Sequence, residues 1–129
     1  MAGNQGAKEG GGEMSIEARL KAVLMRFGDP VENGVYMGTA NRYYTFNVTT
    51  LGADYADDAP QHERYLVQVH LFAPLTFNFV ARRKATKAAL FGAGFRWPEC
   101  TDASDSDGRH IVFETEYAEG VNSDGDDDN

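Results

Sequence analysis

Residues 63–73, ERYLVQVHLFA, form the stretch on which the fold of this chain depends. In an extended strand, successive side chains point to opposite sides, so alternate residues share a face. One face is wholly apolar and is expected in the core; it comprises Tyr65, Val67, Val69 and Leu71. The other face is half apolar and comprises Leu66, Gln68, His70 and Phe72. This pattern predicts a strand that ends at Pro74 and that either lies in the centre of a sheet or meets a partner subunit.

A helix is expected near the start of the chain. Ser15 is a favourable N-cap for a helix that runs to about Phe27, and Gly28 and Pro30 favour its termination. The apolar residues on its expected core face are Ile16, Leu20, Val23, Leu24 and Phe27. Their helical spacing predicts that this face packs on the rest of the domain.

Another strand is expected between this helix and residues 63–73. In residues 43–50, YYTFNVTT, aromatic and β-branched residues alternate with polar ones, which is typical of a strand. Residues 28–42 are rich in turn-forming residues, and no strand is expected there. Residues 51–62 form a polar loop that is long for a hairpin, and loops of this length often carry function.

A second helix is expected over about residues 77–92, because apolar residues again recur at helical spacing. The expected core stripe comprises Phe77, Val80, Ala81, Ala85, Ala88 and Phe91. Phe79 and Leu90 fall on the opposite side, near Arg83. Because a helix that is apolar on two sides is poorly accommodated in a monomer, we expect Phe79 and Leu90 to contact a neighbouring subunit.

Two further strands complete the expected fold. Residues 95–101, FRWPECT, contain Pro98 and are therefore expected at a sheet edge, and residues 109–118, RHIVFETEYA, alternate regularly. The order helix, two strands, helix, two strands predicts an α+β fold. It has a four-stranded, mainly antiparallel sheet with two helices on one face.

The ends of the chain differ in composition from the single domain expected over residues 14–121. Residues 1–13 are Gly-rich and contain nothing to bury, so a flexible leader is expected, without the apolar stretch of a signal peptide. Residues 122–129 are rich in Asp and are expected to be a disordered acidic tail. No apolar run approaches the ~20 residues of a spanning helix, so no membrane association is expected.

The overall composition excludes several classes of protein. The chain has 129 residues, of which 42% are hydrophobic, enough for the core of one domain. Cys100 is the only cysteine, so no intrachain disulfide forms, and it is expected to pack as a small hydrophobic residue. The net charge of −8 argues against tight wrapping of nucleic acid, which requires clustered Lys and Arg.

No motif predicts a catalytic, cofactor or metal site, and an enzyme is not expected. Residues 105–108 with Glu114 partly match a calcium-binding loop, but the first ligand position would be Ala103 and the flanks are strands. The chain shows neither a phosphate-binding loop with its lysine nor a nucleophile elbow. Zinc requires four ligands, so His62, His70 and His110 are expected as histidines of the sheet surface. His70 and His110 meet only if their strands are neighbours.

Two charged clusters are candidate contact sites. Asp54, Asp57 and Asp58 lie in the 51–62 loop. We expect them to be simply solvated rather than to bind a cation. If they have a role, docking to a basic surface of a partner is favoured over catalysis. The basic cluster on the second helix comprises Arg82, Arg83, Lys84 and Lys87. Its alternatives are contact with phosphates, pairing with acidic loops of a neighbouring copy, and a simple solvated helix face.

The order of these segments resembles that of the tail-terminator (tail-completion) proteins of long-tailed bacteriophages. The resemblance covers about residues 14–118. It is carried by the tyrosine-led strand 43–47, the loop Ala56-Asp57-Asp58, the strand 64–72, the Ala- and Lys-rich helix leading into Gly94-Phe95, and the closing strand 109–114.

This resemblance implies a structural virion protein without a cofactor. Its subunits would form a ring, usually a hexamer, that closes the head-proximal end of the tail tube, stops tube polymerisation and meets the head connector or stopper protein. Genomic DNA would pass through the lumen without specific binding, and assembly would take place in the host cytoplasm. The subunit or partner contacts expected for such a ring are Asp57, Asp58, Phe79, Arg83 and Leu90. The alternatives are another small head–tail connector or head-completion protein, or an acidic cytoplasmic binding or inhibitor module.

Overall fold

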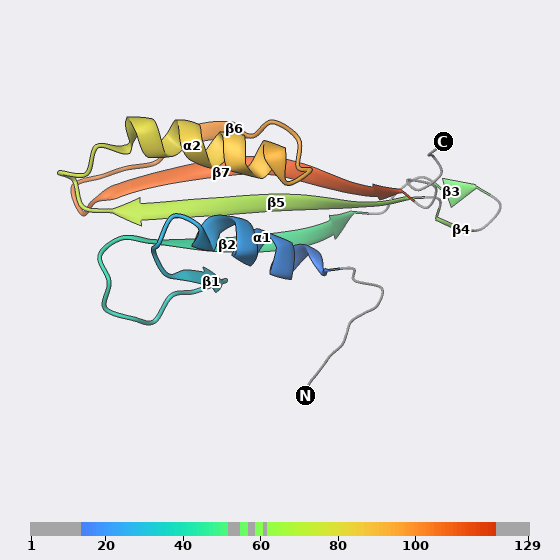
Figure 1. Cartoon of the computed structure of the whole chain (residues 1–129), viewed down its shortest axis with the longest axis horizontal. Helices are drawn as coiled ribbons and strands as arrows, with labels where there is room; N and C mark the ends of the chain where they lie inside the picture. The colour runs from blue at the N-terminus through green and yellow to red at the C-terminus, as the bar shows by residue number, and fades with distance from the viewer. Residues whose placement is uncertain (1–13, 52–54, 57–58, 61, 121–129) are drawn as a thin grey trace.

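Two helices pack on one face of a five-stranded sheet, so the expected α+β class is confirmed (Figure 1). The computed structural model describes residues 14–51, 55–56, 59–60 and 62–120. The expectations for the leader, the acidic tail and the aspartates of the 51–62 loop lie outside the described residues. The elements in chain order are α1 (Ile16–Met25), β1 (Val31–Asn33), β2 (Tyr43–Leu51), β3 (Tyr55–Ala56), β4 (Ala59–Pro60), β5 (His62–Ala73), α2 (Phe79–Gly92), β6 (Glu99–Asp102) and β7 (Arg109–Gly120).

The long strand β5 forms the centre of the sheet. The strand order is β1-β2-β5-β7-β6, and β3 and β4 form a separate antiparallel pair. β5 pairs antiparallel with β2 on one side and with β7 on the other. The central position predicted for residues 63–73 is therefore confirmed.

The sheet has five strands rather than four, and its first strand was not expected. β1 lies in the turn-rich segment and pairs in parallel with β2, whereas the other pairings in this sheet are antiparallel. Two backbone bonds flank it: Tyr44 N–H donates to the Pro30 carbonyl at 2.9 Å, and Gly34 N–H donates to the Phe46 carbonyl at 2.8 Å. A strand of three residues is too short to show alternation in the sequence. The predicted element order and strand count were therefore wrong.

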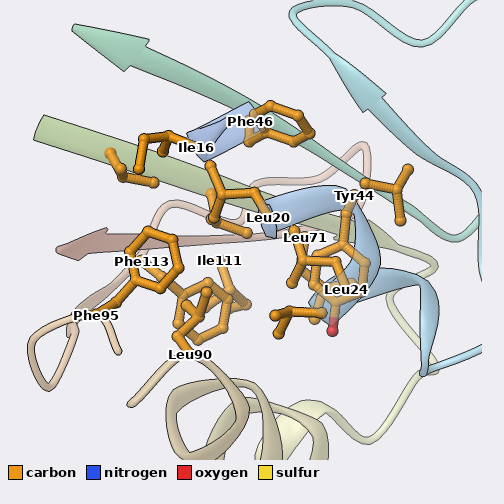
Figure 2. Close-up of a cluster of buried hydrophobic side chains, with 14 residues drawn as sticks. Ile16, Leu20, Leu24, Tyr44, Phe46, Leu71, Leu90, Phe95, Ile111 and Phe113 are labelled. Carbon is orange, nitrogen blue, oxygen red and sulfur yellow. The ribbon is translucent and has the colours of Figure 1, made fainter. Parts of the chain in front are cut away.

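The core lies between the helices and the covered face of the sheet. Ser15 caps α1 as predicted, since its Oγ accepts a hydrogen bond from Ala18 N–H at 3.0 Å. The buried residues of α1 are Ile16, Leu20, Val23 and Leu24, all from the predicted face. They pack against side chains of β2, β5 and β7 (Figure 2). The largest of these are Tyr44, Phe46, Leu71, Ile111 and Phe113.

Helix α2 buries the face opposite to the one predicted. Its buried residues are Thr86 and Leu90, whereas Val80 and Phe91 of the predicted core stripe are 54% and 57% exposed. Thr86 is polar, so apolar spacing in the sequence does not indicate that it faces the core. Its hydroxyl donates to the Arg82 carbonyl at 2.7 Å and lies 2.7 Å from the hydroxyl of Tyr44, so its burial leaves no unpaired polar group.

Candidate subunit interface

Neither helix covers the second face of the sheet, although Tyr36 packs on it at Tyr43. Side chains alternate along each strand, so this open face carries the half-apolar set predicted for residues 63–73. Leu66 is 42% exposed on it, and Gln68, His70 and Phe72 are half-buried. A large, partly apolar surface of this kind is typical of a site where a protein contacts a partner.

A row of aromatic and imidazole rings crosses the open face from β2 to β7. The ring centroids lie 4.4 Å apart for Tyr36 and Tyr43, 4.9 Å for Tyr43 and Phe72, and 4.3 Å for Phe72 and His110. The register explains the row, because Tyr43 lies opposite Phe72 and Phe72 lies opposite His110. These stacked rings give the open face a rigid apolar band.

His70 and His110 meet at the end of this row. Their strands are neighbours, which is the condition under which an approach was expected, and His70 Nδ1 lies 2.8 Å from His110 Nε2. Burial lowers the pKa of His70, and the charge of His110 lowers it further, while Glu114 acts in the opposite direction. His70 therefore favours its neutral form, in which the two rings can share one hydrogen bond.

A groove of about 510 Å³ lies on the same face, beside the segment that leads from α2 into β6. Its apolar lining includes Leu66 and Trp97, of which Trp97 is 53% exposed. Its polar lining is organised by hydrogen bonds across the strands. Gln68 donates to Glu114 at 2.8 Å, and Arg64 and Arg96 both contact Glu116, at 3.0 Å and 3.4 Å.

Two acids in this groove face each other without a cation between them. Glu99 of β6 and Glu114 of β7 are directly opposite in the sheet register. Both side chains are exposed, and neither forms an ion pair with a described residue, whereas Glu116 lies between two arginines. Like charges at opposite positions destabilise a strand pair. The groove thus has a local negative charge that a cation from outside would neutralise.

The outer face of α2 is the second surface that the described residues leave uncovered, and we call it the α2 face. Its exposed residues are Val80, Ala81, Lys84, Ala85, Ala88 and Phe91. Phe91 also packs edge-on against Trp97, with centroids 5.5 Å apart. Because α2 contains no acidic residue, this face is both apolar and positively charged.

Arg82 does not belong to this exposed basic surface. It bonds Asp29 at 2.8 Å, and Arg42 bonds the same carboxylate at 3.0 Å. The Arg82 guanidinium also stacks on Phe27 and Phe77. Contact of Arg82 with phosphates is therefore unfavourable, because the residue fastens α2 to the segment that follows α1. Lys84 is the residue of the predicted basic cluster that is exposed.

The structure places the predicted contact residues in different environments. Leu90 is 0% exposed in the core, so the expectation that it contacts a neighbouring subunit was wrong. Phe79 is half-buried between the guanidinium groups of Arg83 and Arg109, at 5.3 Å and 4.8 Å from its ring centroid. Asp57 and Asp58 lie outside the described residues.

The remaining candidates are structural. The loop before β7 is a hairpin turn in which Asp105 accepts a hydrogen bond from Asp107 N–H at 2.8 Å. Bonds from Ser104 hold the pKa of Asp102 below its usual range. Cys100 is half-buried against the core, and burial raises the pKa of its thiol. Within the described residues there is no group of three metal-ligating side chains.

Comparison with known proteins finds neither a matching family model nor a matching curated protein. In the described part of the chain, no helix is long and apolar enough to cross a membrane. The candidate site is therefore defined by its geometry: an open sheet face with an acidic groove, and an apolar, basic α2 face on the other side of the sheet.

Proposed function

We propose that this protein is a ring-forming tail terminator of a long-tailed bacteriophage. Its ring caps the head-proximal end of the tail tube, stops tube polymerisation and joins the tail to the head connector. The single observation that supports this proposal best is that, among the described residues, one small domain has two uncovered surfaces of different chemistry, one on the open sheet face and one on the outer side of α2. A subunit whose contact surfaces differ and lie on opposite sides assembles head to tail, and such contacts generate rings when the rotation closes.

The segments that carry the family resemblance also lie together in space. Residues 43–47 belong to β2, residues 64–72 to β5 and residues 109–114 to β7, which are three adjacent strands. They form the centre of the sheet and most of its open face. The resemblance thus involves one continuous structural unit rather than scattered matches.

The charge of the chain is compatible with DNA transit through a ring. With a net charge of −8, the protein does not attract the phosphate backbone, so DNA passes a lumen of this composition without being held. The accessible cations of α2 belong to the proposed subunit contact, where they are not available to DNA.

The test is assembly of the purified full-length chain with tail tubes of its phage. We expect light scattering to give a closed oligomer, electron micrographs to show a ring with a lumen, and added protein to limit tube length. A strict monomer that never associates with tubes would overturn the proposal. Binding to the head connector alone would favour a head-completion protein. Loss of all partner binding on deletion of residues 122–129 would favour the acidic binding module.

A further inference from the structure

The groove and the α2 face have complementary chemistry. The groove presents the opposed acids Glu99 and Glu114 beside the exposed apolar side chain of Leu66. The α2 face presents Lys84 between the exposed apolar side chains of Val80 and Phe91. Each surface thus offers an apolar area together with the charge that the other lacks.

The two acids create a specific requirement for a cation. In the described part of the chain, Arg96 in the groove and Arg64 beside it both contact Glu116. Among these same residues, Glu114 accepts a side-chain hydrogen bond only from the neutral Gln68. A lysine placed between Glu99 and Glu114 by a partner would convert their repulsion into two attractive contacts.

The α2 face also suits burial. The residues between its two large apolar side chains include Ala81, Ala85 and Ala88, which lose no side-chain entropy when they are buried. The helix has 14 residues, which corresponds to a length of roughly 21 Å. The face is therefore a straight, low-relief surface that can lie along the strands of a sheet.

We propose that the α2 face of one copy docks into the sheet groove of the next copy, with Lys84 placed between Glu99 and Glu114. This inference rests on the proposed ring and names the contact that closes it. The occupant of the groove is a second copy because every copy carries both halves of the contact, on opposite sides of its sheet. The contact is heterologous, so it repeats around a ring without leaving either surface exposed.

Charge reversal in the full-length chain tests this contact. Lys84→Glu places an acid against the two glutamates of the groove, and Glu99→Lys places a lysine against Lys84. Each single variant should weaken self-association by about tenfold or more at low salt. The double variant Lys84→Glu/Glu99→Lys should restore part of the association, because the new carboxylate then meets the new lysine, although it still faces Glu114. Sedimentation equilibrium measures all four chains.

Mixing the two single variants gives an independent result. In a ring where the two variants alternate, two kinds of contact form. In one, the carboxylate of Lys84→Glu meets the lysine of Glu99→Lys. In the other, an unchanged α2 face meets an unchanged groove. The mixture should therefore associate more strongly than either variant alone. The matched controls are Lys21→Glu on the exposed side of α1 and Glu32→Lys on β1, at the other edge of the sheet. Both controls should associate like wild type.

A neutral substitution separates packing from charge. Val80→Ser removes apolar area at one end of the α2 face and should weaken association, whereas Val35→Ser, at a position that is 69% exposed outside the α2 face, should not. Far-ultraviolet circular dichroism should show that all variants remain folded, because every substituted residue is exposed.

The outcomes distinguish this inference from the proposed function. If wild type forms rings that cap tubes but both reversals leave association unchanged, the docking contact is wrong and the terminator role stands. If the reversals weaken association and the double variant does not restore it, the pairing of Lys84 with this groove is wrong. If wild type never associates, both proposals fail.

Discussion

Tyr44 of β2 donates its hydroxyl hydrogen to Thr86 Oγ1 of α2 at 2.7 Å inside the core. The direction follows because Thr86 uses its single hydroxyl hydrogen to bond the Arg82 carbonyl. Both side chains are 0% exposed. Because the two hydroxyls satisfy each other, this bond fixes which side of α2 faces the sheet.

Thr86→Val should reduce the free energy of unfolding by about 1–3 kcal/mol, because it leaves the Tyr44 hydroxyl buried without an acceptor. Tyr44→Phe should cost less, about 0.5–1.5 kcal/mol, since Thr86 keeps its bond to the Arg82 carbonyl. The double variant should lose less than the sum of the two. Urea unfolding monitored by circular dichroism measures all three.

The control for this series is Thr76→Val, an exposed threonine at which the change should stay within about 0.5 kcal/mol. A Thr86→Val variant as stable as wild type would mean that α2 does not bury this face.

The same bond shows where sequence reasoning failed. Alternation predicted β2, β5 and β7 correctly, because nearly every inward residue of these strands is apolar. Helical spacing predicted α1 correctly for the same reason. In α2 the inward face contains Thr86 and Arg82, whose polar groups are satisfied by partners from other elements, Tyr44 and Asp29. A sequence does not show that such long-range partners exist, so helical spacing alone predicts that the alanine-rich face is the core.

The candidate site was predicted only in part. The half-apolar second face of β5 indicated a surface that meets a partner, and that face is uncovered in the described part of the chain. The groove was not predicted, because it depends on the register between β6 and β7. A shift of one residue would place Glu99 and Glu114 on different faces.

The stability of the protein should depend on pH through His70. The pKa of His70 is lowered from 6.5 by burial and then by the charge of His110, so the folded state binds fewer protons than the unfolded state. This contribution to stability is fully present above the unfolded pKa of about 6.5, and it is lost as the pH falls towards the folded pKa. His70→Gln should therefore flatten the fall in the free energy of unfolding between about pH 7 and pH 5.

His110→Gln separates the two causes. It removes the neighbouring charge but leaves His70 half-buried, so the pKa of His70 should rise and remain below 6.5. Imidazole chemical shifts measured by nuclear magnetic resonance report this value directly. A His70 pKa at or above 6.5 in the wild-type protein would contradict the proposed origin of the pH dependence.

Two glycines at the end of α2 should respond in opposite directions to alanine. Gly94 has a φ of 102°, and a Cβ there would lie 3.3 Å from the Tyr117 ring, so Gly94→Ala should cost about 1–2 kcal/mol or more. Gly92 is the last residue of α2, and a Cβ there meets nothing within 4 Å. Gly92→Ala should stabilise the protein by about 0.5–1 kcal/mol. The urea midpoint of each variant is compared with that of wild type, and each variant is the control for the other. Equal changes in the two midpoints would mean that α2 does not end at Gly92.

Glu99→Gln should stabilise the isolated subunit while it weakens self-association. Removing one of the two opposed carboxylates relieves their repulsion, which should raise the free energy of unfolding by about 0.2–1 kcal/mol at low salt. The gain should disappear near 1 M salt, where the Debye length is about 3 Å. Glu32→Gln is the matched control, because Glu32 lies opposite the uncharged Thr45. Unfolding is measured at protein concentrations too low for self-association, so that it reports the free energy of unfolding of the isolated subunit. A variant that is less stable than wild type at low salt would show that Glu99 and Glu114 do not repel each other across the groove.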